Sequence, residues 1–200
     1  MKKPAAFILA ALSTLYVNSW AGPSDLYVGL DVFGGNNDFD VDVSGSIYGS
    51  GSFDDDSKGF KLKFGALLVN DLRLQGYLQS ENFDDPIFDN TNDQLVEIGI
   101  DLIKEFIVSP ELSPFIQGGI GYGAMDLDRY YYTDDAINEI NLKVGLGLMF
   151  RVTPAVELLA GVDFQWRRWS DITYDDGYDY FNVETKDSSQ RYYGGVNFHF

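Results

Sequence analysis

The fold is decided by one stretch of the chain, Gln190-Arg191-Tyr192-Tyr193-Gly194-Gly195-Val196-Asn197-Phe198-His199-Phe200. Counted back in steps of two from the last residue, one set is apolar, aromatic or glycine: Phe200, Phe198, Val196, Gly194 and Tyr192. The intervening set is mostly polar or small: His199, Asn197, Gly195, Tyr193 and Arg191. Successive side chains of a β-strand point to opposite faces, so this stretch predicts a strand with one apolar face.

The same alternation recurs along the chain and predicts seven further strands. Their apolar positions fall within residues 26–33, 60–69, 72–79, 96–102, 115–123, 140–150 and 156–167. Between residues 104 and 113 the register stays open, and a bulge is the expected interruption. The fold class predicted is all-β, an eight-stranded antiparallel up-and-down β-barrel that spans a membrane.

The connections alternate between long and short. Four are long, acidic and rich in Gly, Asn, Ser or Tyr, and we expect loops over residues 34–56, 81–93, 126–136 and 169–187. Three are short turns near residues 70, 111 and 154. Bacterial outer-membrane barrels have long extracellular loops, short periplasmic turns and an even number of strands. The long connections are therefore expected outside the cell and the short ones in the periplasm.

The N-terminus and the overall composition narrow the class further. Residues 1–21 combine Met1-Lys2-Lys3, the apolar run Ala5–Val17 and a small-x-small cleavage site, Ser19-Trp20-Ala21, and they predict a cleaved secretory signal peptide. Residues 22–200 then form the outer-membrane barrel. The formal charge of −17 excludes nucleic acid as a partner, and the absence of cysteine excludes disulfides and thiol chemistry.

Charged residues on the polar face indicate which face is enclosed. Six are basic and six acidic, a near balance that suits mutual neutralisation in a confined interior. Turned towards lipid instead, each Lys or Arg would cost roughly 2–4 kcal/mol at mid-bilayer. We assign six of these residues to the lumen: Lys61, Arg73, Glu97, Lys143, Asp163 and Arg167. A soluble barrel with an apolar ligand cavity is the alternative.

Aromatic residues are expected at both membrane interfaces. Phe150, Phe198 and Phe200 fall near the periplasmic rim of the predicted barrel. Tyr122, Trp166, Trp169 and Tyr192 fall near the outer rim.

The chain resembles the small eight-stranded outer-membrane barrels of the OmpA-like type. The resemblance is carried best by residues 114–123, PFIQGGIGYG, and 144–154, VGLGLMFRVTP. It implies that Tyr192, Val196, Phe198 and Phe200 act as the assembly signal read by the barrel-assembly machinery. The larger OmpA proteins carry a peptidoglycan-binding domain after the barrel, and none is expected here.

Residues that could support catalysis are few. Barrel enzymes of the lipid-modifying, phospholipase and omptin protease types resemble one another in using a histidine, and the sequence has one, His199, expected at the periplasmic rim. Asp38-Phe39-Asp40-Val41-Asp42 opens like a calcium loop, but Val43 and Gly49 stand where glycine and glutamate are required. No enzyme activity, cofactor or metal site is therefore expected.

Three functions remain from this reading. The first is a non-enzymatic structural or adhesin-like role through acidic extracellular loops rich in tyrosine (Tyr130, Tyr131, Tyr132, Tyr174, Tyr178 and Tyr180). The second is a narrow ion or small-solute channel, and the third is a lipid-modifying enzyme. The expected partners are outer-membrane lipid, lipopolysaccharide, the assembly machinery and an extracellular ligand or host surface, with the chain itself a monomer.

Overall fold

The computed structural model describes residues 26–46, 48–88, 93–127, 136–175 and 180–200. Most of these residues lie in nine antiparallel strands: β1 (Leu26–Gly45), β2 (Gly49–Leu67), β3 (Leu72–Phe83), β4 (Gln94–Glu105), β5 (Leu112–Asp126), β6 (Ala136–Thr153), β7 (Val156–Trp169), β8 (Ile172–Asp175) and β9 (Tyr180–His199). A single 3-10 turn, η2 (Val69–Asp71), joins β2 to β3. Among the described residues, no helix is long and apolar enough to cross a membrane.

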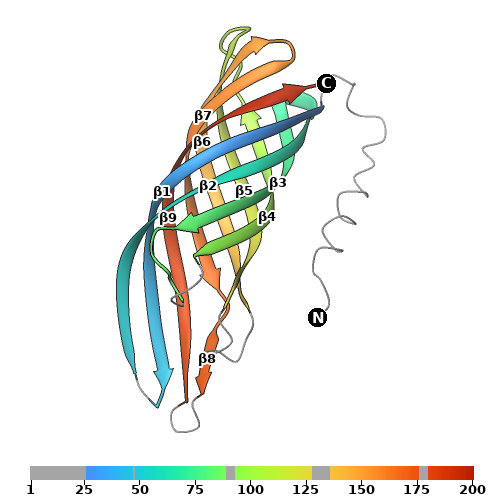
Figure 1. Cartoon of the computed structure of the whole chain (residues 1–200). Coiled ribbons are helices and arrows are strands. Elements are labelled where there is room, and N and C mark those ends of the chain that lie inside the picture. The colour runs from blue at the N-terminus through green and yellow to red at the C-terminus, as the bar shows by residue number, and fades with distance from the viewer. Residues whose placement is uncertain (1–25, 47, 89–92, 128–135, 176–179) are drawn as a thin grey trace, which may run out of the picture.

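The strands close into a barrel (Figure 1). Each of β1 to β7 pairs with its neighbour in sequence, β7 pairs with β9, and β9 returns to pair with β1. The short strand β8 pairs with the first residues of β9, Tyr180–Val183, and lies outside this ring of eight strands. The predicted eight-stranded antiparallel up-and-down β-barrel is confirmed. The predicted signal peptide, residues 1–21, lies outside the described residues.

One band of the outer surface is apolar. Outward side chains on every strand of the barrel are exposed and hydrophobic, among them Leu30, Leu62, Ile100, Ile120 and Leu146. The band ends along a line through outward Val32, Phe60, Leu78, Val96, Tyr122, Ile140, Trp166 and Tyr192. Polar outward residues follow beyond this line, on β1, β3 and β5 after Gly34, Ser80 and Ala124: Asn36, Lys58, Asn82, Gln94, Asp126, Asn138, Arg168 and Gln190. A belt with such an edge fits lipid on the outside and leaves the polar face enclosed.

Beyond this line the structure corrects two predicted loops. Residues 34–56 belong mostly to β1 and β2, which stay paired from Leu26↔Ala66 to Val43↔Gly49. The loop predicted over residues 169–187 contains β8 and the first part of β9. Here the polarity of the two faces is reversed: Asp38 and Asp40 point outward, and Phe39 is buried. The Asp- and Gly-rich composition resembled a loop, although the alternation of a strand was present.

The opposite end of the barrel carries the short turns, and we call it the turn end. Asn70 and Asp71 adopt positive φ angles of 59° and 58°, as residues of a tight turn often do. Between residues 104 and 113 the pairing of β4 and β5 is regular up to Glu105↔Phe115, so the predicted bulge there is wrong. The register shift instead lies between Arg151 and Thr153, where β6 meets β7. The C-terminus of β9 lies at this same end (Figure 1).

Candidate functional site: a charged interior and a protruding sheet

The inward face of the barrel carries more acid than the sequence analysis assigned to it. Ten carboxylates are buried, against six basic side chains. The predicted balance of six and six is therefore wrong, since four acids were missed. The four are Asp55, Glu105, Glu139 and Asp187. Asp55, Glu139 and Asp187 are each two residues from another buried polar residue on the same strand, a spacing that could have identified them, whereas Glu105 is two residues from apolar Ile103.

Nearest the turn end, Arg73 of β3 connects two buried acids. Its guanidinium donates two hydrogen bonds of 2.8 Å to Glu157 of β7 and a further bond to Glu105 of β4. Asn197 donates to the same Glu157 carboxylate at 2.9 Å. His199 Nε2 lies 3.8 Å from Glu157 Oε1, with the histidine ring beside Tyr27. Arg73, which was predicted to face the lumen, thus links β3 to β7 across the barrel.

The middle of the interior is a balanced set of three lysines and three aspartates. Lys63 Nζ lies 2.6 Å from Asp31, Lys143 Nζ lies 2.8 Å from Asp101, and Lys61 Nζ lies 4.0 Å from Asp163. Lys143 also lies over the Tyr77 ring at 4.0 Å, a favourable cation–π contact. The predicted lumen residues Lys61, Lys143 and Asp163 all belong to this set.

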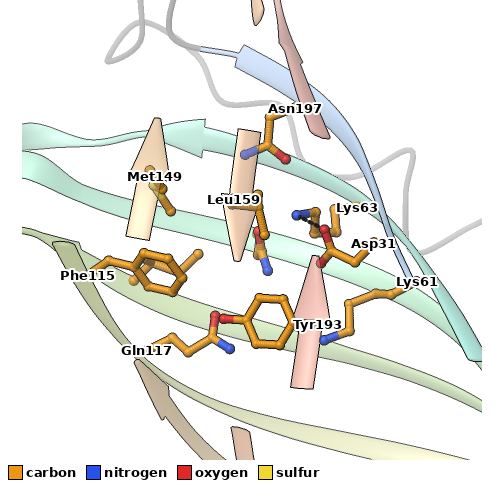
Figure 2. Close-up of a pocket in the computed structure, with 11 residues that line it drawn as sticks. Asp31, Lys61, Lys63, Phe115, Gln117, Met149, Leu159, Tyr193 and Asn197 are labelled. Atoms are coloured by element: carbon orange, nitrogen blue, oxygen red, sulfur yellow. Dashed lines mark hydrogen bonds and ion pairs between the residues drawn. The ribbon is translucent and has the colours of Figure 1, made fainter. Parts of the chain in front are cut away.

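A small cavity adjoins these pairs (Figure 2). Apolar Phe115 and Met149 stand on one side of it, and Asp31, Lys61 and Lys63 on the other. Its volume is about 10 Å³, which is room for about one water molecule. The barrel interior at this level is therefore filled by side chains, as expected for eight strands.

Further from the turn end lies a layer with four acids and two arginines. Glu81 receives hydrogen bonds from Arg167 and Arg191, and Asp187 accepts one of 2.7 Å from the Trp169 indole. Glu97 accepts a 2.5 Å bond from the Tyr77 hydroxyl. The fourth acid, Glu139, accepts a 3.3 Å bond from Asn141. Predicted lumen residues Arg167 and Glu97 both lie in this layer.

An apolar cluster covers this layer on the side away from the turn end. We call it the apolar cap, and it consists of Phe39, Phe83, Leu95, Met125, Leu127, Ile137, Trp169 and Ile172. Ile87 and Phe88 pack against it, with the Phe88 and Trp169 rings 5.0 Å apart. Trp169 was expected in the outer aromatic belt, but it is 1% exposed because it faces inward. The cap separates the charged layer from the protruding sheet.

Beyond the cap, four strands continue as the protruding sheet, in the order β2-β1-β9-β8. Both edges of this sheet lack a further strand within the described residues: Gly49–Asp55 of β2 extend past the last β3 pair, Ser57↔Phe83, and past the hydrogen bond from Asp84 N to Asp56 O, and β8 pairs only with β9. Its outer face carries Asp38, Asp40, Asp42 and Asp54. Its inner face lines an apolar pocket of about 120 Å³ formed by Val41, Phe53, Ile87, Phe88, Ile172, Val183 and Thr185.

The remaining predicted residues fall as follows. Tyr192, Phe198 and Phe200 are exposed on the outer surface, and Val196 shares their face of β9. Phe150, Tyr122 and Trp166 also face outward at the two edges of the apolar band. Tyr174 and Tyr180 belong to β8 and β9, whereas Tyr130, Tyr131, Tyr132 and Tyr178 lie outside the described residues.

The closed ring, the apolar band and the charged interior together define the class. They are the features of a small outer-membrane β-barrel, in which every strand is paired and polar side chains face the lumen. This agrees with the outer-membrane location predicted from the sequence.

Comparisons with known proteins support the same fold. Neisserial surface protein A is similar over 88% of this chain and 97% of its own, with 22% identity and a TM-score of 0.51. The outer-membrane protein OprG of Pseudomonas aeruginosa is similar over 90% of this chain and 98% of its own, with 11% identity and a TM-score of 0.59. No protein-family model and no curated protein matches the chain. The predicted resemblance to small outer-membrane barrels is confirmed at the level of the fold.

Proposed function

We propose that the chain is a non-enzymatic surface-interaction protein, adhesin-like in action, whose barrel anchors the protruding sheet in the outer membrane. The observation that carries this proposal is the continuation of β1 past the apolar band. From Gly34 to Gly45 the strand extends about 40 Å, at about 3.3 Å per residue. A sheet of this length, with a polar outer face and its own apolar core, offers a preformed surface at low entropic cost of binding.

Two features of the protruding sheet suit recognition of another macromolecule. Unpaired edge strands present backbone N–H and C=O groups that an extended partner segment can pair with. The acidic outer face adds electrostatic selectivity, because it favours a partner with basic groups and repels acidic ones. The extracellular ligand or host surface expected from the sequence would contact this sheet, while lipid and lipopolysaccharide surround the apolar band. The barrel-assembly machinery is a partner during insertion.

The filled interior argues against the channel alternative. Between the apolar cap and the turn end, the cavity beside Lys61 and Lys63 has a volume of about 10 Å³. A hydrated ion needs more room than this, and the cap adds an apolar barrier. For the enzyme alternative, His199 lies at the turn end beside Glu157, as the last residue of β9, whereas the protruding sheet contains the first part of the same strand.

The test is adhesion of cells that display the chain. Residues 38–54 would be replaced by Asn-Gly, which keeps the paired part of β1 and β2 within the band. Binding to cultured epithelial cells and to an immobilised extracellular-matrix protein would be compared with that of the parent chain. We expect binding to fall at least tenfold while the barrel stays folded. A second variant replaces residues 126–136 and 170–187, the other segments that the sequence predicted as extracellular loops. Unchanged binding in both variants would contradict the proposal.

A further inference from the structure

The apolar pocket on the inner face of the protruding sheet has no part in the proposed function. Its wall comes from five segments, β1, β2, β8, β9 and the stretch that follows β3, and its volume is about 120 Å³. Ile172 and Thr185 are almost fully buried, at 3% and 1% exposed, whereas Phe53 is 39% exposed. The pocket therefore has a buried floor and a side that solvent reaches.

Two glycines leave the open side of the pocket bare. Gly49 and Gly51 lie on the same face of β2 as Phe53, because alternate residues of a strand share a face. A Cβ atom at either glycine would have no heavy atom of the described residues within 4 Å. Gly51 pairs with Val41, which lines the pocket. A ligand can therefore enter over the edge of β2.

The position of the pocket along β1 separates it from membrane lipid. Val32 marks the edge of the apolar band on this strand, and Val41 lies nine residues further along it. At about 3.3 Å per residue, the pocket is about 30 Å beyond the band, measured along the strand. The acyl chains of the bilayer do not extend that far, so an occupant comes from the aqueous side.

The size and the walls of the pocket suit one aromatic ring. An apolar cavity of about 150 Å³ can hold benzene, so a pocket of about 120 Å³ with an open side has room for a molecule of similar size. Of the lining rings, Phe53 stacks on Phe39 with centroids 4.9 Å apart, and Phe88 packs edge-on against Trp169 at 5.0 Å. Both are thus held by the apolar cap, and both can make the stacked or edge-to-face contacts that aromatic rings prefer.

One polar side chain, that of Thr185, lines this otherwise apolar pocket. Its hydroxyl is buried and has no hydrogen-bond partner among the described residues. Unpartnered polar atoms also occur in the charged lumen, but this one borders a cavity large enough to hold its partner. A hydroxyl both donates and accepts, so it suits a ligand with one OH or NH group. None of the described lining residues is charged, which favours a neutral ligand.

We propose that this pocket binds a small neutral aromatic molecule with one hydrogen-bonding group, of the size of phenol or indole. Its ring would contact Phe53 and Phe88, and its OH or NH group would bond to Thr185 Oγ1. The apolar walls would supply most of the affinity, and the single polar contact would fix the orientation. The site goes beyond the proposed function, which concerns the outer face and the edges of the same sheet.

The test uses the full chain in phospholipid nanodiscs, because a detergent could fill the pocket itself. The probe is 4-fluorophenol, and its binding is followed by fluorine NMR, with empty nanodiscs as the measure of partition into lipid. We expect saturable binding of about one molecule per chain. Thr185→Val keeps the shape of the side chain, and it should weaken the binding of 4-fluorophenol at least threefold while that of fluorobenzene stays unchanged.

The matched control is Ser189→Ala. It removes another buried hydroxyl of β9 that has no partner among the described residues but does not line the pocket, so it should leave the binding of both probes unchanged. Uptake no greater than that of empty nanodiscs, or equal affinities of the parent and Thr185→Val for 4-fluorophenol, would overturn the proposal.

Two further measurements locate the bound probe. Nuclear Overhauser effects should connect its ring protons with the methyl groups of Ile87, Ile172 and Val183; contacts with methyl groups of the apolar band alone would contradict the site. Gly51→Trp places an indole at the open side and should weaken binding at least tenfold, whereas Ser52→Trp, on the outer face of the same strand, should not. Undiminished binding in Gly51→Trp would also contradict the proposal.

Discussion

Arg73 on β3 and Glu157 on β7 join opposite walls of the barrel through two parallel hydrogen bonds, each 2.8 Å long. The two residues are 84 positions apart in sequence and 1% exposed. When a guanidinium donates two parallel hydrogen bonds to one carboxylate, the pair is short, planar and directional. It fixes the spacing of strands that are not neighbours, and it closes the lumen at the turn end.

Removing one member of this pair should be costly. Arg73→Met leaves Glu105 and Glu157 as buried charges without their guanidinium, so we expect a loss of about 3–5 kcal/mol in the free energy of unfolding. Urea titration of the barrel in detergent, followed by its heat-dependent electrophoretic mobility, measures the loss. The control is Lys104→Met, which breaks the exposed 3.5 Å pair with Asp71 and should cost about 0–1 kcal/mol. Equal losses in the two variants would contradict the role of Arg73.

Two glycines test how tightly the interior is filled. A Cβ atom at Gly147 would stand 2.4 Å from the Ala160 carbonyl oxygen and 2.6 Å from the Phe115 ring. Gly147→Ala should therefore destabilise the barrel by about 1–3 kcal/mol. Gly76→Ala is the matched change, because its nearest atom would be 3.9 Å away, and it should be nearly neutral. The same urea titration compares them, and a neutral Gly147→Ala would mean that the interior is loosely packed.

The edge of the apolar band predicts where charge is tolerated on the outside. Leu146 lies midway along the outward apolar run of β6 and is 55% exposed. Leu146→Arg should cost about 2–4 kcal/mol in a lipid bilayer. Asp40→Arg, on the outer face of the protruding sheet, should leave stability almost unchanged. Both are measured by unfolding in phospholipid vesicles; a tolerated arginine at position 146 would contradict a lipid-facing band.

Asp55 gives the protruding sheet a dependence on pH. Burial raises the pKa of this carboxyl above its ordinary value of 3.8, with hydrogen bonds from the backbone opposing the shift. The folded form therefore holds the proton more tightly than the unfolded one. The contribution of Asp55 to the free energy of unfolding is therefore fully present below pH 3.8. This contribution is lost as the pH rises through the raised pKa.

Hydrogen exchange of the amides at residues 49–56 measures this effect locally. At neutral pH, Asp55→Asn should slow their exchange, because it removes the buried charge. Below about pH 4 the parent and the variant should exchange equally once the intrinsic pH dependence is corrected. Slower exchange of the variant at both pH values would show that the gain does not come from ionisation.

The barrel could be predicted from the sequence because one physical rule applies to every strand within the membrane. Lipid outside and a charged lumen inside give an alternation such as Val144, Leu146 and Leu148 against Lys143, Gly145 and Gly147. Beyond the bilayer that rule reverses, as in Phe39 inward and Asp40 outward, so the protruding parts of β1 and β2 were assigned to a loop. Trp169 was misplaced for the same reason, since it lies past the edge of the band and faces the core of the cap.

The interior pairs could not be predicted individually. Alternation indicates that Arg73, Glu97 and Lys143 face the lumen, but not which of the facing strands supplies each partner. That depends on the tilt of the strands and on the register across the barrel, which brings Arg73 to Glu157 over 84 residues. Glu139 was missed because it stands at the edge of the predicted strand, next to an acidic segment.

The central claim is that a closed outer-membrane barrel holds the protruding sheet outside the cell. Since the chain has no cysteine, single substitutions Ser52→Cys on the protruding sheet and Ala155→Cys in a turn can be labelled selectively. On intact cells, a membrane-impermeant maleimide should label Cys at position 52 at once. It should label position 155 only after the outer membrane is permeabilised. Labelling of position 155 but not 52 on intact cells, or of neither in the outer-membrane fraction, would contradict the account.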